Sequence, residues 1–250
     1  VLDPSFGGCA FMQAAASHLK RRSCTSPGRQ VFGVDVDESC VRYVRDSPDL
    51  FEANVAFRDF LATRASDLDG APFHAIVGNP PYVRHHWLKD ERRAAARRIT
   101  QDSGQVLPET ASLWAYFVLH ALAFLEPGGR LAMLVPEAIL QADYAVAVRA
   151  ALQQTFRRVR LIHLRERLFE GTDEPVVVIA AEGSGTPGSL DVLSVDTADE
   201  LRAVLQGKAP SQGGTTLPNG RRVPSDALHA LTTIQSSPSL VKFGEFATPH

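Results

Sequence analysis

Short apolar runs and longer segments with helical spacing alternate along this chain. The apolar runs have the length of buried strands and lie at residues 1–3, 31–35, 55–57, 75–77, 130–136, 159–164, 175–180 and 190–195. Between them, apolar residues recur every three or four positions, most strongly from Thr110 to Glu126. Strands that alternate with helices of these lengths predict a twisted, mainly parallel sheet with helices on both faces. The pattern therefore predicts an α/β protein.

The last part of the pattern differs from the rest. The runs Val159–Leu164 and Pro175–Ala180 are too close in sequence to enclose a crossover helix, so we expect an antiparallel hairpin at one edge of the sheet. The segment Gly183–Gly188 has the Gly, Ser, Thr and Pro content of a linker. We therefore divide the chain into an α/β domain of residues 1–183 and a second part, residues 184–250, made of a linker and the start of a further, truncated domain.

The composition indicates a protein with a buried core and without a membrane segment. Of the 250 residues 44% are hydrophobic and 22% charged, and no apolar run approaches the roughly 18 residues of a membrane span. No signal peptide is visible, and the three cysteines, Cys9, Cys24 and Cys40, lack metal-type spacing. We therefore expect a cytoplasmic protein without disulfides or a metal site. The chain begins inside a predicted strand without an initiating Met, so we expect a fragment of a longer protein.

The charge balance bears on nucleic-acid binding. A formal net charge of −2 argues against binding through a uniformly basic surface. A local basic face is compatible with that charge, because Arg92, Arg93, Arg97 and Arg98 recur at helical spacing. Such a run is either a candidate contact for phosphates or an ordinary solvated face of a helix.

One strand ends in a turn with unusual chemistry. After Ala75–Val77 the chain reads Gly78, Asn79, Pro80, Pro81 and Tyr82. The two prolines fix φ near −65° and have no N–H, and Asn79 is pushed toward an extended conformation because it precedes a proline. A turn of this kind presents hydrogen-bond acceptors and suits a planar group that carries an NH2. The alternative interpretation is an ordinary proline-rich turn after a strand.

Three other predicted strands end near acidic residues. Asp3 opens a turn with two glycines that leads directly into a helix, and such a turn leaves backbone N–H groups free to approach a ligand. Asp35 follows about 30 residues later, where nucleotide-binding α/β units place the acid that holds ribose hydroxyls. Asp59 and Phe60 form a polar and aromatic pair that can bond and cover an adenine ring. Taken singly, each acid is equally compatible with a turn or a helix cap.

The spacing of these motifs resembles a known family. The segments DPSFGG, GVDVDE, RDFL, NPPY, PGGRLAMLVP and LFEG, the last before a VVVIA strand, resemble the gamma-type amino-group DNA methyltransferases, adenine-specific enzymes of restriction-modification and related phage-defence systems. The match covers about residues 1–183. It implies a Rossmann-like class I fold that uses S-adenosylmethionine. It also implies that residues 184–250 lead toward a target-recognition domain, and that a cofactor motif normally found upstream of the first strand is missing.

The resemblance assigns roles to individual residues. Asn79 and Pro80 would accept hydrogen bonds from the target amino group, Tyr82 would stack on the extruded base, and Phe169 would cover the other face of that base. The methionine, ribose and adenine parts of the cofactor would meet the motif residues, namely Asp3, Pro4, Phe6, Gly7, Asp35, Asp59, Phe60 and Asn79. The chain departs from the family at Cys9, where a glycine is common.

The chemistry of the turn leaves several substrates open. An adenine amino nitrogen is a poor nucleophile because its lone pair is delocalised into the ring, and two fixed acceptors would favour the tetrahedral nitrogen of the transition state. We expect double-stranded DNA as the partner, with a nuclease or a specificity domain or subunit as a further candidate. Cytosine in DNA, a protein glutamine amide and guanine of ribosomal RNA present the same NH2 chemistry. A non-catalytic DNA-binding subunit with the same fold is a further alternative.

Overall fold

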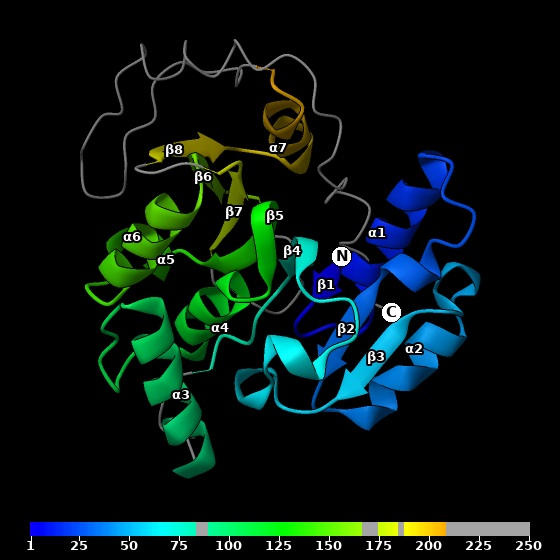
Figure 1. Cartoon of the computed structure of the whole chain (residues 1–250). Coiled ribbons are helices and arrows are strands. Elements are labelled where there is room, and N and C mark those ends of the chain that lie inside the picture. The colour runs from blue at the N-terminus through cyan, green and yellow to red at the C-terminus, as the bar shows by residue number, and fades with distance from the viewer. Residues whose placement is uncertain (84–89, 167–174, 185–187, 209–250) are drawn as a thin grey trace.

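A single eight-stranded sheet organises the chain (Figure 1). The computed structural model describes residues 1–83, 90–166, 175–184 and 188–208. The strands follow the spatial order β3-β2-β1-β4-β5-β7-β6-β8. Their bounds are β1 Leu2–Asp3, β2 Phe32–Asp35, β3 Asn54–Phe57, β4 Phe73–Gly78, β5 Leu125–Pro136, β6 Arg158–Leu164, β7 Val176–Glu182 and β8 Ser189–Val195.

The pairing of the strands confirms the predicted mixed sheet. β1 pairs in parallel with β2 and β4, β2 with β3, and β4 with β5. β7 is antiparallel to both β5 and β6, which confirms the predicted hairpin. The hairpin is not the edge, however, because β8 pairs in parallel with β6 along its whole length, from Arg158 opposite Ser189 to Leu164 opposite Val195.

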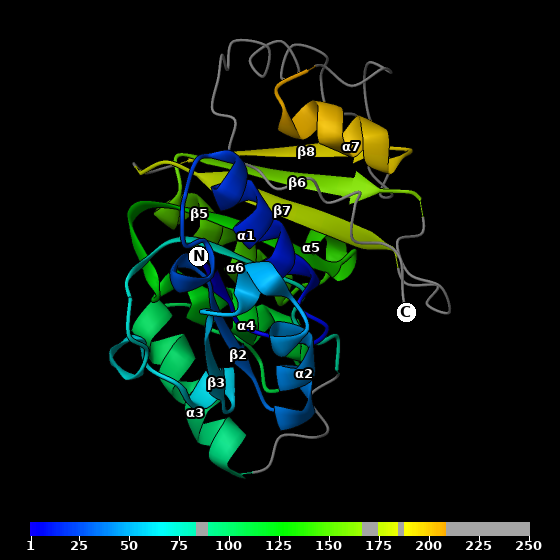
Figure 2. The ribbon, with the colours of Figure 1, turned by 90° about the vertical axis from the view of Figure 1, so that its right-hand side faces the viewer.

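Helices cover both faces of the sheet (Figures 1 and 2). Their bounds are α1 Ala10–Arg21, α2 Val41–Arg45, α3 Asp90–Ser103, α4 Leu113–Leu122, α5 Ala138–Gln141, α6 Ala145–Thr155 and α7 Ala198–Leu205. On one face, fully buried Trp114 of α4 and Leu152 of α6 share a core cluster with Ile76 of β4. On the other face, Met12 of α1 packs above β2, and Leu201 of α7 packs above β6 and β7. The two faces follow the alternation of side chains along each strand.

The residues after the predicted linker extend the same sheet. β8 lies beyond β6, and Leu201, Val204 and Leu205 of α7 are buried against the hairpin strands. Residues 189–205 therefore share the core of the preceding domain. The further domain predicted for the rest of 184–250 concerns residues 209–250, which lie outside the described residues.

Two element boundaries differ from the sequence prediction. α4 spans Leu113–Leu122, whereas the apolar pattern predicts a helix over 110–126. β5 begins at Leu125 because the Phe73 N–H of the neighbouring strand already bonds the carbonyl of Phe124. Residues Pro127–Gly129, which lie between the predicted helix and the predicted strand at 130–136, fall inside β5 where its register shifts against β4. None of the helices in the described ranges has the length and apolar character that a bilayer crossing requires.

Candidate active site

The carboxyl ends of β1, β2, β3 and β4 meet at one edge of the sheet and surround a cleft of about 390 Å³. In parallel α/β sheets, this edge is where ligands bind. Residues from all four strand ends line the cleft, and α4 closes its far side. The lining residues are Pro4, Ser5, Asp35, Val36, Arg58, Asp59, Phe60, Asn79, Pro81, Val83, Leu113 and Phe117.

Asp3 is the most deeply buried acid at this edge, with 1% of its surface exposed. Its Oδ1 accepts a hydrogen bond from Ser5 N at 3.1 Å, while its Oδ2 is buried without a hydrogen-bond partner. Burial, with a smaller contribution from the nearby charge of Asp35, raises the pKa of Asp3 to about 7, although the bond from Ser5 opposes the shift. A buried acceptor without a donor suits a ligand that brings a positive charge or an N–H group.

Asp35 ties the turn after β1 to the turn after β2. Its Oδ2 accepts from Gly7 N at 2.9 Å, and its Oδ1 accepts from Asp37 N at 3.0 Å. Each carboxylate oxygen has a second lone pair, so the group can still accept from ligand hydroxyls in the cleft that it lines. The structure therefore brings the predicted Gly7 and Asp35 into direct contact.

Phe6 and Cys9, the other two residues singled out in the first turn, are core residues. Phe6 is 3% exposed and packs edge-on against Phe57 with ring centroids 6.0 Å apart, and it is not among the residues that line the cleft. Cys9 is fully buried and adopts a left-handed φ of +65°, the conformation that the glycine of the family supports without strain.

Asp59 and Phe60 both border the cleft, but they contribute in different ways. The Asp59 Oδ1 accepts from Leu61 N at 3.1 Å and caps a short 3-10 turn, Phe60–Ala62. The Phe60 ring is 1% exposed and lies in an aromatic cluster with Phe117, at a centroid distance of 5.4 Å, and with Phe124, at 5.0 Å. Phe60 therefore lines the cleft from within this aromatic cluster, and its role in covering an adenine ring stays a prediction.

The turn that follows β4 borders the same cleft. Asn79 lines the cleft, and its Oδ1 is buried without a hydrogen-bond partner. Pro80 is buried and Pro81 borders the cleft. Gly78 is required just before them, because a Cβ at this position would lie 2.9 Å from Asp3 Oδ1 and 3.2 Å from Pro4 Cδ. The glycine lets the turns after β1 and β4 approach each other.

Of the two aromatic residues predicted to hold a target base, Tyr82 lies within the described residues and Phe169 does not. Tyr82 is half-buried and packs against the core clusters on both faces of the sheet. Phe169 lies outside the described residues. The next residue after Tyr82, Val83, is 44% exposed and lines the cleft.

The cleft also contains residues that the sequence analysis missed. Val36 is 62% exposed, which is unusual for an apolar residue, and Arg58 stands beside Asp59. Leu113 and Phe117 come from α4. Their helical spacing predicts core positions, and the sequence gives no signal that distinguishes them from other core residues of this helix. Ser5, Val36 and Arg58 each lie next to a motif residue in the sequence, and this adjacency could have identified them.

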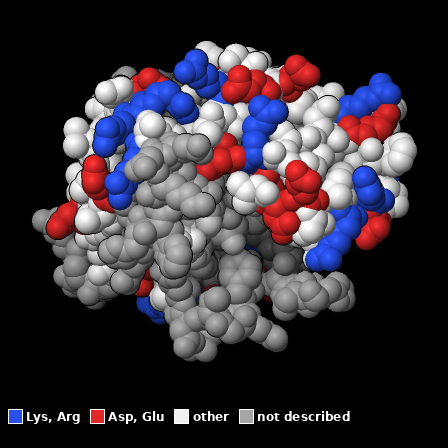
Figure 3. Space-filling model, turned by 90° about the horizontal axis from the view of Figure 1, so that it is seen from below, with Lys and Arg blue, Asp and Glu red and all other residues white. Residues whose placement is uncertain are grey.

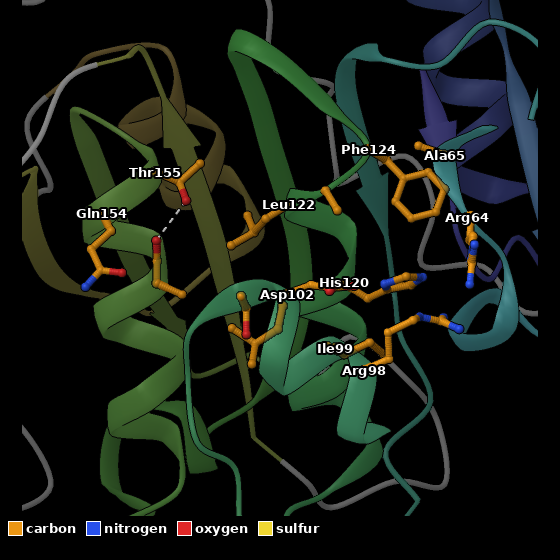
Figure 4. A pocket seen from close by; sticks show the side chains of 14 residues that line it. Arg64, Ala65, Arg98, Ile99, Asp102, His120, Leu122, Phe124, Gln154 and Thr155 are labelled. Atoms are coloured by element: carbon orange, nitrogen blue, oxygen red, sulfur yellow. Dashed lines mark hydrogen bonds between the residues drawn. The ribbon is translucent and has the colours of Figure 1, made fainter. Parts of the chain in front are cut away.

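A second cavity, of about 630 Å³, lies between the C-terminal ends of α3, α4 and α6 (Figure 4). Arg98 and His120 line it, and both bond the turn behind the first cleft: Arg98 Nη2 donates to Leu61 O at 2.7 Å, and His120 Nε2 donates to Thr63 O at 2.8 Å. Burial lowers the pKa of His120. Arg98 therefore braces the turn that carries Asp59, whereas Arg93 and Arg97 of the same predicted basic face are exposed. None of the motif residues lines this cavity.

Charge is mixed on the surface seen from below (Figure 3). Over the part of this face that belongs to described residues, Lys and Arg side chains are interspersed with Asp and Glu side chains. Within the described ranges, no three His, Cys, Asp or Glu residues are grouped as metal ligands.

Comparisons with known proteins agree with this geometry. The family described as N-6 DNA Methylase matches residues 1–204. The type II methyltransferase M.AccI of Acinetobacter calcoaceticus is 22% identical over 207 residues, which are 82% of this chain and 36% of that protein. The chain thus spans about a third of the length of this curated relative.

Solved structures share the fold. The M protein of the type I restriction enzyme EcoKI superposes with a TM-score of 0.58 at 16% identity, over 91% of this chain and 47% of that one. A protein of Listeria monocytogenes, provisionally described as a class I S-adenosylmethionine-dependent methyltransferase, gives a TM-score of 0.60 at 19% identity, over 78% of this chain and 58% of that one. The predicted class I fold is confirmed.

Proposed function

This chain belongs to the N-6 DNA methylase family, and we propose that it transfers the methyl group of S-adenosylmethionine to the exocyclic amino nitrogen of an adenine in double-stranded DNA. The observation that carries the proposal is the buried, unpartnered Oδ1 of Asn79 at the cleft. An acceptor in this position costs stability unless a donor arrives. An amino group supplies that donor.

The acids around the cleft suit the cofactor. S-adenosylmethionine supplies an electrophilic methyl group on a sulfonium and carries positive charge. Asp3 has a buried oxygen without a partner beside the turn after β1, and Asp35 keeps free lone pairs toward the cleft. We assign Asp3 to the cationic methionine part, Asp35 to the ribose hydroxyls, and Asp59 with the backbone after it to the adenine. The exposed Val36 side chain gives that ring an apolar surface.

The turn after β4 activates the target nitrogen without a general base. Asn79 Oδ1 and the carbonyl of Pro80 would accept one amino hydrogen each, and both would favour the tetrahedral nitrogen whose lone pair attacks the methyl carbon. The bond from that carbon to the sulfonium sulfur breaks in the same step, S-adenosylhomocysteine leaves, and the methylated nitrogen releases one proton to solvent. Both acceptors are preorganised, because the two prolines fix the backbone between them. Removing one preorganised dipole of this kind typically costs a factor of about 10² to 10³ in rate.

Access to the amino group requires the base to leave the duplex. Extrusion costs a few kcal/mol, and stacking on an aromatic ring returns roughly 1 to 3 kcal/mol per contact. We assign the two stacking contacts to Tyr82 and Phe169, on the strength of the family resemblance. We propose double-stranded DNA as the partner, with a nuclease or a specificity domain or subunit as a further candidate.

The decisive experiment is transfer of labelled methyl to DNA by the full-length protein, followed by digestion and identification of the labelled nucleoside. We expect N6-methyladenine. Label in N4-methylcytosine would change the base, and label in protein or ribosomal RNA with unlabelled DNA would replace the proposal with the corresponding amide or guanine methylation. A protein that gives no label, and whose melting temperature does not rise with S-adenosylmethionine, would be a non-catalytic subunit, since a ligand that binds only the folded state must stabilise it.

A further inference from the structure

The turn after β4 has few backbone N–H groups with which to form hydrogen bonds of its own. Pro80 and Pro81 have no N–H groups, so this stretch cannot donate backbone hydrogen bonds to its surroundings. Its carbonyls are the groups that neighbours can bond. A turn with this composition must be fixed by donors that come from other parts of the chain.

Donors of this kind are present on both sides of the two prolines. On the near side, Ser5 Oγ donates to the backbone carbonyl of Asn79 at 3.1 Å. On the far side, the carbonyl of Val83 accepts from Leu113 N at 3.0 Å and from Ser112 Oγ at 3.3 Å. On the far side, two donors bond the same carbonyl, and one of them is a backbone N–H. The near anchor, beside the proposed catalytic amide, depends on one hydroxyl.

Ser5 is itself held in a fixed position. It lies in the turn after β1, and its N–H donates to Asp3 Oδ1 at 3.1 Å. The close approach of the two turns depends on Gly78, where a Cβ would meet the same Asp3 oxygen at 2.9 Å. Ser5 therefore connects the turn assigned to the cofactor with the turn assigned to the target amino group.

Fixing one carbonyl orients both proposed acceptors. The Asn79 carbonyl lies in the peptide plane between Asn79 and Pro80. From that plane to the carbonyl of Pro80 the chain passes through the φ of Pro80, which the ring locks, and its ψ, which is restricted because Pro81 follows. On the other side, the Asn79 side chain starts from the Cα next to the same plane. One hydrogen bond to this plane thus restrains the direction of the Pro80 carbonyl and the backbone from which the Asn79 side chain starts.

We propose that Ser5 is a positioning residue that aligns the two acceptors of the target amino group through its hydrogen bond to the Asn79 carbonyl. This inference rests on the proposed function. Ser5 also lines the cleft, so the competing role is a direct contact with the cofactor. The two roles differ in their kinetics, because misaligned acceptors slow the chemical step, whereas a lost cofactor contact weakens binding.

The test is the Ser5→Ala variant of the full-length protein, with kcat from methyl transfer to DNA and the cofactor Kd from calorimetry. We expect kcat to fall about five- to tenfold, the size of one net hydrogen bond, and the cofactor Kd to stay within about twofold of the parent value. Ser5→Thr, which keeps the hydroxyl, should restore kcat to within about twofold. Ser103→Ala is the matched control, because Ser103 Oγ also donates to a backbone carbonyl, that of Thr100, but in α3. It should leave kcat unchanged.

The outcomes separate this inference from the proposed function. An unmodified protein that binds the cofactor but methylates neither DNA nor another substrate would contradict the proposed function. An active parent with unchanged kcat in Ser5→Ala, or with Kd weakened in parallel with kcat, would overturn the positioning role alone. If Ser5→Ala melts too low for kinetics, the near-isosteric Ser5→Cys, a weak donor, should give an intermediate kcat at unchanged Kd. A Ser5→Cys kcat equal to that of the parent would equally overturn the role.

Discussion

The turns that follow β1 and β4 lie next to each other at the same edge of the sheet, yet their backbones are held in opposite ways. In the turn after β1, the N–H groups of Ser5 and Gly7 donate to the carboxylates of Asp3 and Asp35, and the N–H of Phe6 donates to a carbonyl of β2. In the turn after β4, two consecutive residues have no N–H, and neighbouring donors bond its carbonyls instead.

This difference determines which forces act on each turn. The first turn depends on hydrogen bonds to two carboxyl groups, and the pKa of one of them, Asp3, is raised to about 7. The second depends on locked φ angles, on the absence of a Cβ at Gly78 and on the hydroxyl of Ser5. Substitutions in the first turn should therefore change cofactor affinity and pH dependence, whereas substitutions in the second should change the rate of transfer or the fit between the turns.

The largest effect is expected for Asn79→Ala, which removes the amide acceptor and leaves the prolines in place. Methyl transfer should fall at least about 100-fold, because a preorganised acceptor of the transition state is lost. The calorimetric Kd for S-adenosylmethionine should stay within about threefold. Asn54→Ala is the matched control: Asn54 is exposed at the start of the edge strand β3, and its backbone bond to Val31 is kept. A large loss of cofactor affinity in Asn79→Ala would mean that Asn79 binds the cofactor, the role assigned to the turn after β1.

Asp35→Ala should weaken cofactor binding more than it slows methyl transfer, the opposite of Asn79→Ala. The substitution removes the acceptor for Gly7 N and Asp37 N, as well as the proposed contact with ribose hydroxyls. Since bonds to a charged group are worth about 1.5 to 3 kcal/mol, the cofactor Kd should rise at least about tenfold. Single-turnover transfer at saturating cofactor should change much less. Asp37→Asn serves as the control, because it keeps the Oδ1 acceptor that caps Ser39 N. Unchanged affinity in Asp35→Ala would contradict the assignment.

Part of the cleft could be predicted from the sequence alone. Asn79, Asp35 and Asp59 line the cleft, and the sequence placed each of them at the end of a strand whose apolar pattern is clear. Parallel strands put such ends on one edge.

What the sequence could not provide is the direction of side chains that are compatible with two environments. The packing of Phe60 against Phe117 and Phe124 could not be read from the sequence, because an aromatic residue after an acid is compatible with a core position as well as with a contact to a ligand ring. Arg98 turns inward to Leu61, although the sequence analysis grouped it with the exposed Arg97 in one candidate basic face. The strand at 190–195 was predicted but placed in the second part of the chain, because composition does not reveal that it pairs with β6. These features depend on neighbours distant in sequence.

Gly78→Ala tests the close approach of the turns directly. The added Cβ would lie 2.9 Å from Asp3 Oδ1 and 3.2 Å from the Pro4 ring, so one of the turns must move. Overpacking of this kind costs about 1 to 3 kcal/mol, and chemical denaturation should show a corresponding loss in the free energy of unfolding. Gly8→Ala is the comparison, since a Cβ there meets nothing within 4 Å, and it should cost less than about 1 kcal/mol. Equal effects of the two substitutions would mean that the turns are not in contact.

The smallest expected effect is a pH dependence carried by Asp3. Burial raises its pKa from the ordinary 3.8 to about 7 in the folded protein. Between these values the folded state holds a proton that the unfolded state has lost, so the free energy of unfolding decreases as pH rises, and the decrease ends once the folded carboxyl ionises above about pH 7. His120 and His163, whose pKa burial lowers, change stability in the opposite direction. The quantity to measure is therefore the difference between the parent and Asp3→Asn. From pH 6 to pH 8 the parent should lose about 1 kcal/mol more than Asp3→Asn in urea unfolding. Parallel pH profiles would show that Asp3 is already ionised in the fold, and that the turn after β1 is held by charge without a proton.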